Sequence, residues 1–286
     1  MTPPLAFADL APFLPPAPPG RIERHVAGAL VRATLFRRRK AGAWPVPADL
    51  PHEDLAFRGN TGARIAGRHF PVAGARGIVV LAHPDRRYGQ FWFVREGWVQ
   101  WLRGHGYACL TFDFSQYGAS RGGSTYLFED LAAAARLARD LHPGLPVHVI
   151  GLSIGAFSAA NASPDLDFVE ALVLESPYPS FGSWYEGDGH RFGKAVMRGF
   201  DRLFPRTARL IQADQRIARA GARRILVAAS RDDEVTPVRL SRRVADRAPT
   251  GRSEYLELEG HPHLGLFRDI RYREAVLRTL AGAPSP

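Results

Sequence analysis

The sequence predicts an α/β domain in which helices cover both faces of a doubly wound, mostly parallel sheet. Short apolar runs alternate with helix-like segments from about residue 52 to residue 280. Short apolar runs are typical of buried strands, and strands that alternate with helices form parallel sheets through right-handed crossovers. At 286 residues, the chain is long enough for one such domain with a large core.

The predicted elements follow one another regularly along the chain. In chain order the predicted strands are EDLAFRG and RIAGRHFPV (an opening hairpin), GIVVLAH, YACLTFDF, PVHVIG, EALVLES, RILVAAS and SEYLELE. The predicted helices are 94–104, 127–141, the segment after Ser153, 237–247 and 264–280. We assign residues 51–286 to this domain.

Residues 1–50 form a separate N-terminal part. Residues 1–20 are rich in proline, and we expect them to be extended. Residues 21–40 carry apolar residues at helical spacing and seven basic residues against one acid, which predicts a basic amphipathic helix. Such a helix either packs on the main domain with a solvated basic face or makes a weak contact with an anionic membrane surface.

A long interruption separates the strands EALVLES and RILVAAS. It spans about residues 178–222 and is rich in aromatic residues and arginines. Such a segment is too long for an ordinary connection, and in a parallel sheet it lies above the carboxyl ends of the strands, where ligands bind. We therefore predict a helical cap. Its aromatic residues Tyr178, Phe181, Trp184 and Tyr185 are our candidates for substrate contact.

Composition narrows the possible partners and compartment. The net charge is +10, but more than half of it comes from residues 21–40, and the remaining arginines are scattered, so we do not expect nucleic-acid binding. The single cysteine, Cys109, cannot form an internal disulfide. The N-terminus does not resemble a secretory signal, and no run is long enough for a membrane span. We expect a soluble, cytoplasmic protein without a metal or a cofactor, and the oligomeric state stays open.

The stretch HVIGLSIGAF places Ser153 between Gly151 and Gly155, after a predicted strand and before a predicted helix. This context is what a nucleophile elbow requires, although a G-x-S-x-G match alone is common. A serine nucleophile needs an adjacent base, and that base needs a group that fixes its tautomer. We expect both at the carboxyl ends of later strands.

Two later loops supply these groups. After RILVAAS comes RDDEVTP, where Asp233 is the preferred acid and Asp232 a neighbour that caps the turn. After the last strand comes GHPHLGLF, where we prefer His263 to His261 as the base, because LGLF is expected to begin the closing helix and fix the direction of its side chain. Glu175, at the end of EALVLES, is an alternative acid.

These motifs make the chain resemble the α/β-hydrolase family over roughly residues 52–280. GLSIG resembles the nucleophile elbow of that family, and DFSQYGAS resembles its D-x-R-G-x-G-x-S turn at Asp113, Gly118 and Ser120, but has Ser115 and Gln116 in place of arginine and glycine. DDEVTP and GHPHLG resemble its acid and histidine loops. The resemblance implies an α/β-hydrolase sheet with Ser153, Asp233 and His263 as a catalytic triad.

The resemblance also implies an oxyanion hole made of two backbone N–H groups. Ile154, directly after the nucleophile, is expected to supply one. The second donor of the family follows a His-Gly pair, and here HPDRRYG puts Pro84 in place of the glycine and makes Asp85 the donor. A carboxylate beside a forming oxyanion repels it unless the side chain points away or pairs with Arg86 or Arg87.

The sequence therefore predicts a serine hydrolase that cleaves a carboxylic ester or thioester through an acyl-enzyme on Ser153. The small-molecule substrate is expected to have an apolar portion. A peptidase or amidase with the same triad, or a non-catalytic ligand-binding or scaffold protein of the same fold, are the alternatives.

Overall fold

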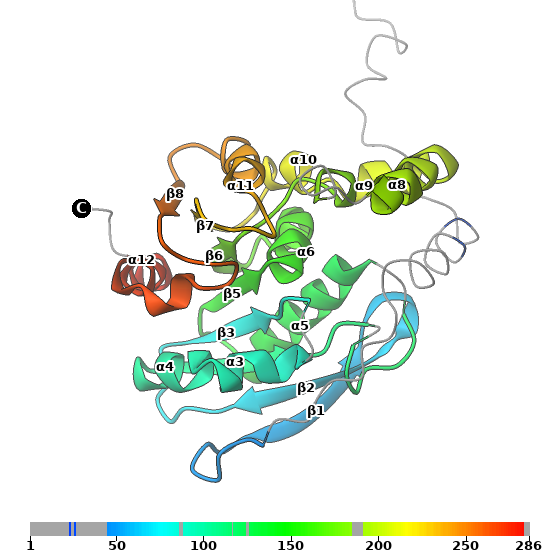
Figure 1. The fold of residues 1–286 in the computed structure, drawn as a ribbon. Helices are drawn as coiled ribbons and strands as arrows, with labels where there is room; N and C mark the ends of the chain where they lie inside the picture. The colour runs from blue at the N-terminus through cyan, green and yellow to red at the C-terminus, as the bar shows by residue number, and fades with distance from the viewer. Residues whose placement is uncertain are drawn as a thin grey trace, which may run out of the picture.

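A computed structural model describes residues 23, 26, 45–85, 88–115, 117–123, 126–184 and 191–282. The strands are β1 (Glu53–Arg58), β2 (Arg64–Phe70), β3 (Gly77–Ala82), β4 (Tyr107–Phe112), β5 (Val147–Leu152), β6 (Val169–Glu175), β7 (Arg224–Ser230) and β8 (Ser253–Leu258). They form one sheet in the order β1-β2-β4-β3-β5-β6-β7-β8 (Figure 1).

The sheet is parallel from β4 to β8 and antiparallel only at its first edge. Strand β2 pairs antiparallel with both β1 and β4, and every pairing from β4–β3 to β7–β8 is parallel. All residues of β3, β4 and β5 are buried, which explains why these strands read as continuous apolar runs. The predicted doubly wound, mostly parallel sheet is confirmed.

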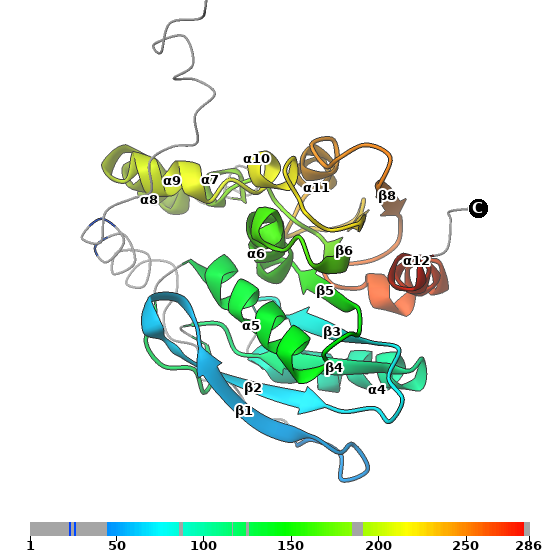
Figure 2. The ribbon, with the colours of Figure 1, turned by 180° about the vertical axis from the view of Figure 1, so that it is seen from behind.

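Helices cover both faces of the sheet. The α-helices are α3 (Trp92–Arg95), α4 (Trp98–Gly104), α5 (Leu127–Leu141), α6 (Ile154–Ala162), α7 (Phe181–Trp184), α8 (Arg191–Leu203), α9 (Pro205–Leu210), α10 (Ala213–Ile217), α11 (Val238–Ala245) and α12 (Ile270–Ala281). Helices α5 and α6 lie on one face, as Figure 2 shows, with a core that includes Val80, Leu131 and Phe157. Helices α4 and α12 cover the other face around Trp98 and Val276.

Two predicted helices have different bounds in the structure. The helix expected over 94–104 is divided into α3 and α4 at Gly97, whose φ of 84° lies in the left-handed region that glycine tolerates best. The closing helix begins at Ile270 and not near residue 264. Leu264 has a φ of 67°, and the side chain of Asp269 accepts a hydrogen bond from the N–H of Arg271, which caps the helix there.

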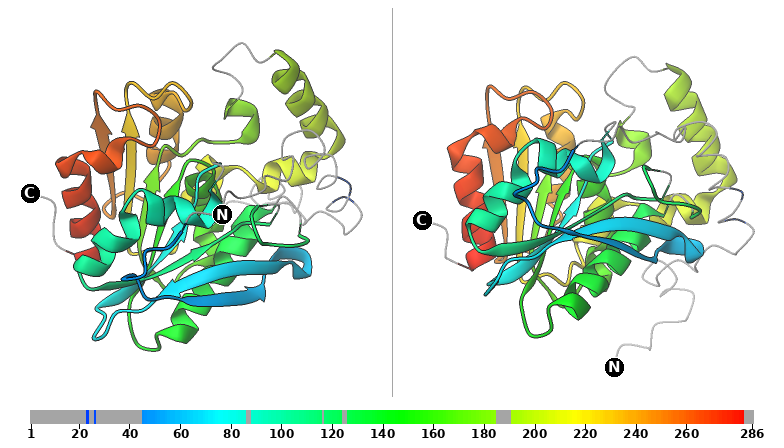
Figure 3. Two further views of the ribbon diagram at one scale, coloured as in Figure 1. Left: turned by 60° about the horizontal axis from the view of Figure 1, so that its bottom comes forward. Right: turned by 90° about the horizontal axis from the view of Figure 1, so that it is seen from below.

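The segment between β6 and β7 contains helices α7 to α10. Helix α10 packs on α6, whereas α8 projects at one end of the molecule (Figure 3). Phe200 and Phe204 are buried, and the side chains of Arg198 and Arg202 are exposed. The role of the segment as a cap over the site stays a prediction.

Little of the predicted basic helix over 21–40 falls within the described residues. Only Glu23 and Val26 are described there, and both are helical. The Glu23 carboxylate accepts hydrogen bonds from the N–H and the hydroxyl of Thr207 at 3.1 Å each, so this part of the chain contacts α9. In the described part of the molecule no helix combines the length and the apolar character that a membrane span requires.

Candidate active site

Ser153 lies on a strained turn between β5 and α6. Its φ of 54° and ψ of −113° are rare for a residue with a side chain, and such strain is often found at functional sites. The turn is held on both sides, because the Ser153 N–H donates to the carbonyl of Glu175 (2.9 Å) and its carbonyl accepts from the N–H of Phe157 (2.8 Å). The side chain is therefore presented at the carboxyl edge of the sheet, as the motif predicts.

Both glycines of GLSIG are required by close approaches of the backbone. A Cβ atom on Gly155 would lie 2.0 Å from the carbonyl oxygen of Ala82 at the end of β3. A Cβ atom on Gly151 would lie 2.5 Å from the carbonyl oxygen of Gly155. The motif thus brings the start of α6 against the end of β3, next to the segment that begins at His83.

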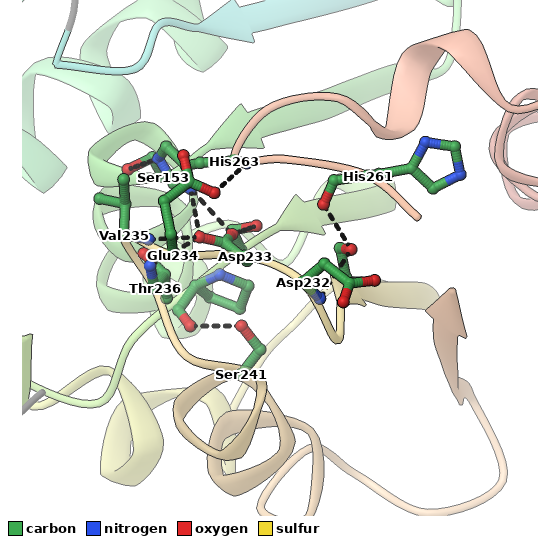
Figure 4. A network of polar contacts seen from close by, with 12 residues as sticks. Ser153, Asp232, Asp233, Glu234, Val235, Thr236, Ser241, His261 and His263 are labelled. Atoms are coloured by element: carbon green, nitrogen blue, oxygen red, sulfur yellow. Dashed lines mark hydrogen bonds and ion pairs between the residues drawn. The ribbon is translucent and has the colours of Figure 1, made fainter. Parts of the chain in front are cut away.

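Ser153, His263 and Asp233 form a continuous hydrogen-bonded chain (Figure 4). The Ser153 Oγ lies 3.1 Å from Nε2 of His263, and Nδ1 of His263 lies 2.8 and 3.0 Å from the carboxylate oxygens of Asp233. A carboxylate only accepts hydrogen bonds, so Nδ1 carries the proton and Nε2 is free to accept the proton of the serine. All three residues are buried.

Asp233 is surrounded by hydrogen-bond donors. Its Oδ1 accepts from the N–H groups of Val235 (3.0 Å) and Thr236 (2.7 Å), and its Oδ2 accepts from the hydroxyl of Ser176 (2.7 Å). Burial alone would raise the pKa of Asp233. The hydrogen bond and charge of His263, with the Thr236 N–H and the Ser176 hydroxyl, outweigh it and hold this pKa below its ordinary value. Asp233 is therefore charged across the neutral range.

The competing residues His261 and Asp232 point away from Ser153 (Figure 4). Nε2 of His261 lies 2.9 Å from the carboxylate of Asp269, and Asp232 accepts a hydrogen bond from the N–H of Gly260 (2.6 Å). Of the two histidines and the two aspartates, the structure therefore brings the preferred ones, His263 and Asp233, together at Ser153. The reason we gave for His263 is wrong, however, because LGLF leads into a short 3₁₀ turn, Leu266–Arg268, and does not begin the closing helix α12; the backbone N–H of His263 is instead held by the Glu234 carboxylate at 3.2 Å.

Glu175 does not reach the histidine. It ends β6 and is fully buried, and Tyr272 and Leu266, on the α12 side of the sheet, lie around its carboxyl group. In the described part of the chain, neither carboxylate oxygen makes a hydrogen bond of normal geometry, although the Tyr272 hydroxyl and the Leu266 N–H lie close enough to favour the charged form. Burial raises the pKa of Glu175 to about 7, which the Tyr272 hydroxyl and the Leu266 N–H offset only partly.

The two predicted oxyanion donors lie on segments that meet at the elbow. The N–H of Ile154 is in the first turn of α6, where a helix offers no backbone acceptor. The Asp85 carboxylate accepts a hydrogen bond from the Tyr117 hydroxyl (3.0 Å), whereas Arg86 and Arg87 lie outside the described residues. Because the Asp85 carboxylate is bound to this hydroxyl, it repels an oxyanion at the Asp85 N–H less than an unpaired carboxylate would.

His83 fixes the segment that carries Asp85. It is fully buried, its Nδ1 lies 2.8 Å from the carbonyl of Pro84, and its Nε2 accepts from the N–H of Phe114 at 3.2 Å. Burial lowers the pKa of His83, so the ring is neutral and bonds on both sides. No pattern in the sequence around His83 indicates this role.

The turn after β4 supports the same region. Both oxygens of Asp113 accept hydrogen bonds, from the backbone and side-chain nitrogens of Gln90 and from the N–H of Ala119. A Cβ atom on Gly118 would lie 2.1 Å from Asp113, and the Ser120 hydroxyl donates to the Asp113 carbonyl. The turn is thus held together by Asp113, Gly118 and Ser120, the three residues that match the family pattern. Gln116 lies outside the described residues.

Known proteins of this architecture match the chain. The family model described as "Serine aminopeptidase, S33" matches residues 73–209, which include Ser153 and end before Asp233 and His263. The esterase Pf2001 from Pyrococcus furiosus superposes with a TM-score of 0.65 at 20% identity and covers 85% of this chain and 95% of its own. The chain has the α/β-hydrolase fold. None of the curated proteins matches its sequence.

Other α/β-hydrolase structures are similar over most of the chain. Acetyl xylan esterase 1 from Thermoanaerobacterium sp. has a TM-score of 0.63 at 15% identity and covers 95% of this chain and 96% of its own. The α/β hydrolase GrgF from Penicillium sp. has a TM-score of 0.61 at 16% identity and covers 81% and 97%. At such low sequence identities, the similarity establishes the fold of this chain but not its substrate.

The predicted substrate-contact residues are only partly described. Tyr178 stacks on Phe157 with ring centroids 4.6 Å apart, and Phe181 lies 4.7 Å from the same ring. Both are almost fully buried, at 1% and 3% exposure, because their rings pack against α6; their contact with a substrate stays a prediction. The side chain of Trp184 and the whole of Tyr185 lie outside the described residues.

Ser176 belongs to this site but is not predicted from the sequence. A single serine after a strand has no distinguishing pattern, and only the fold brings it to Asp233. As for metals, the described residues contain no group of three or more histidine, cysteine or carboxylate side chains placed to bind an ion.

Proposed function

We propose that this protein is a serine hydrolase that cleaves a carboxylic ester or thioester through an acyl-enzyme on Ser153. The observation that carries the proposal is the hydrogen-bonded chain from Ser153 Oγ through His263 to Asp233 on a strained elbow. A hydroxyl is not acidic at neutral pH, and this chain supplies a base with a fixed tautomer.

The reaction follows from the positions of the protons. His263 Nε2 takes the proton of the Ser153 hydroxyl as Oγ attacks the acyl carbon, and Asp233 stabilises the imidazolium that forms. The imidazolium then gives this proton to the leaving alcohol or thiol. A water molecule then attacks the acyl carbon while the same nitrogen takes its proton. The bond between the acyl carbon and Oγ breaks, the imidazolium returns the proton to Oγ, and the acid leaves.

The negative charge that develops on the substrate oxygen needs donors fixed in advance. We assign this role to the backbone N–H groups of Ile154 and Asp85. The helix dipole of α6 favours negative charge at the Ile154 end. The hydrogen bond from Tyr117 draws the Asp85 carboxylate toward its own hydroxyl, which reduces repulsion of the oxyanion.

A peptidase or amidase is the second candidate, because the matching family model is described as a serine aminopeptidase. The same triad cleaves both bond types, and cleavage of an amide depends more strongly on protonation of the leaving amine by the histidine. The esterases among the similar structures favour ester cleavage. A non-catalytic protein of the same fold is the remaining alternative.

Fluorophosphonate labelling and ester hydrolysis test the proposal together. The wild-type protein is expected to label at low probe concentration and to hydrolyse short p-nitrophenyl esters faster than the matching anilides. Ser153→Ala is expected to lose both activities with an unchanged circular dichroism spectrum, because only a hydroxyl is removed. Wild-type turnover in this variant would show that the nucleophile is another group; absence of labelling in the wild type would support the non-catalytic alternative.

A further inference from the structure

Ser176 adopts a backbone conformation that its side chain disfavours. It directly follows β6, and its φ of 52° lies in the left-handed region, where glycine is the unstrained choice. The residue is 1% exposed, and its N–H donates to the carbonyl of Ala228 on β7 at 2.8 Å. A side chain at such a position costs stability, so the hydroxyl is expected to have a compensating role.

The hydroxyl of Ser176 is directed at the acid of the site. It donates to Oδ2 of Asp233 at 2.7 Å, and the same oxygen accepts from Nδ1 of His263 at 2.8 Å. Oδ1 is held by the two N–H groups of the following turn. The serine thus supplies the only side-chain donor besides His263 that the described part of the chain aims at this carboxylate.

We propose that Ser176 is a positioning residue that fixes the orientation of the Asp233 carboxylate and sets how strongly it holds the imidazolium of His263. The proposal rests on the proposed function, because it assigns Asp233 to the triad. A carboxylate with fewer donors is more basic and attracts the imidazolium proton more strongly. Loss of the hydroxyl therefore keeps His263 protonated to a higher pH and leaves the carboxylate free to rotate.

The charged groups around Asp233 come from three elements. His263 lies on the loop after β8, and Glu234 follows Asp233 and binds the backbone N–H of His263. Glu175 ends β6 on the other side of Ser176, and its raised pKa of about 7 keeps it mainly neutral below about pH 6. Measurements between pH 5 and about 6 therefore report on His263 and Asp233 while Glu175 stays mainly protonated.

The test compares Ser176→Ala and Ser176→Gly with the matched control Ser241→Ala. Ser241 is also a buried serine close to the site, but its hydroxyl donates to the carbonyl of Pro177 at 2.9 Å (Figure 4). Two readouts are taken: kcat/KM for p-nitrophenyl acetate against pH, and the NMR titration of the His263 ring, assigned by the loss of its signal in His263→Gln. The titration needs no turnover, so it stands even where the proposed function fails.

Both Ser176 variants are expected to lower kcat about tenfold with little change in KM, as loss of a hydrogen bond to a charged group does. The acidic limb of the rate profile and the His263 titration midpoint are expected to move upward by about half a pH unit. Ser176→Gly is expected to be as impaired as Ser176→Ala but more stable, because glycine relieves the strain. Ser241→Ala is expected to change neither readout.

Three results would overturn the proposal. One is a His263 midpoint in both Ser176 variants equal to that in Ser241→Ala. Another is a rate within about twofold of wild type in both variants. The third is full activity in Ser176→Gly with a loss in Ser176→Ala, which would assign the effect to backbone strain and not to the hydroxyl. A wild-type protein that neither labels nor hydrolyses esters contradicts the proposed function alone, and the titration then decides the role of Ser176.

Discussion

The ends of β6 and β7 each place a buried carboxyl group at the same edge of the sheet, but the two groups differ in their surroundings. Asp233, after β7, accepts hydrogen bonds from His263, Ser176 and two backbone N–H groups. Among the described residues, none makes a hydrogen bond of normal geometry to the carboxyl group of Glu175 at the end of β6. The pKa of Asp233 is lowered, and that of Glu175 is raised to about 7.

The difference shows that directed donors, and not burial, decide whether a carboxyl group at this edge is charged. Burial alone raises the pKa of either group, because it removes water from the charged form. At Asp233 the donors outweigh this effect, whereas at Glu175 they do not, and the nearby charge of Asp233 adds to the cost of ionisation. Only Asp233 is therefore suited to stabilise an imidazolium at neutral pH.

Among the substitutions around Asp233, those of the two histidines are expected to differ most in their effect on kcat. His263→Ala is expected to lower kcat for a p-nitrophenyl ester by about three orders of magnitude, because it removes the base between Ser153 and Asp233. His261→Ala is the matched control on the same loop and is expected to cost about tenfold at most. Equal losses in both variants would mean that the loop, and not the base, is responsible.

Substitution of Glu175 is expected to have a smaller effect, which concerns the free energy of unfolding and its dependence on pH. Its pKa is raised from an ordinary value of 4.5 to about 7 in the folded protein, so the folded state holds its proton longer than the unfolded chain. Stability is therefore lost as the pH rises between these values, by about 3 kcal/mol at most. Glu175→Gln cannot ionise and is expected to be more stable than wild type at pH 8, with little gain at pH 4.5.

Denaturant unfolding at both pH values measures this difference. Glu274→Gln is the matched control, because Glu274 is an exposed carboxylate on α12, the helix that carries Tyr272. It is expected to show the pH dependence of the wild type. A Glu175→Gln variant with the same pH dependence as wild type would mean that folding does not raise the pKa of Glu175.

The sequence predicts most of the fold because the elements are coded locally. The fully buried strands β3, β4 and β5 appear as continuous apolar runs, and the predicted bounds of α5 and β7 agree with the structure. The spacing of GLSIG likewise identifies a turn whose glycines have direct steric reasons. Each of these signals lies within a few neighbouring residues.

The features that the sequence does not predict depend on contacts between distant segments. Leu264 adopts a left-handed conformation that no local pattern indicates, so the closing helix starts later than expected. Ser176 and Asp233 are 57 positions apart, and only the pairing of β6 with β7 makes them neighbours. Tyr178 and Phe181 are candidates for a ligand surface in the sequence, and only the fold shows that both rings pack on Phe157 of α6.

The most direct test of this account compares Asp233→Asn with Glu175→Gln in the same assay. We measure kcat/KM for a p-nitrophenyl ester at pH 7, with circular dichroism to check the fold. Asp233→Asn is expected to lose about three orders of magnitude or more, because an amide favours the wrong imidazole tautomer and carries no charge for the imidazolium. Glu175→Gln is expected to stay within about threefold of wild type. A severe loss in Glu175→Gln with near-normal rates in Asp233→Asn would contradict the assignment of the acid.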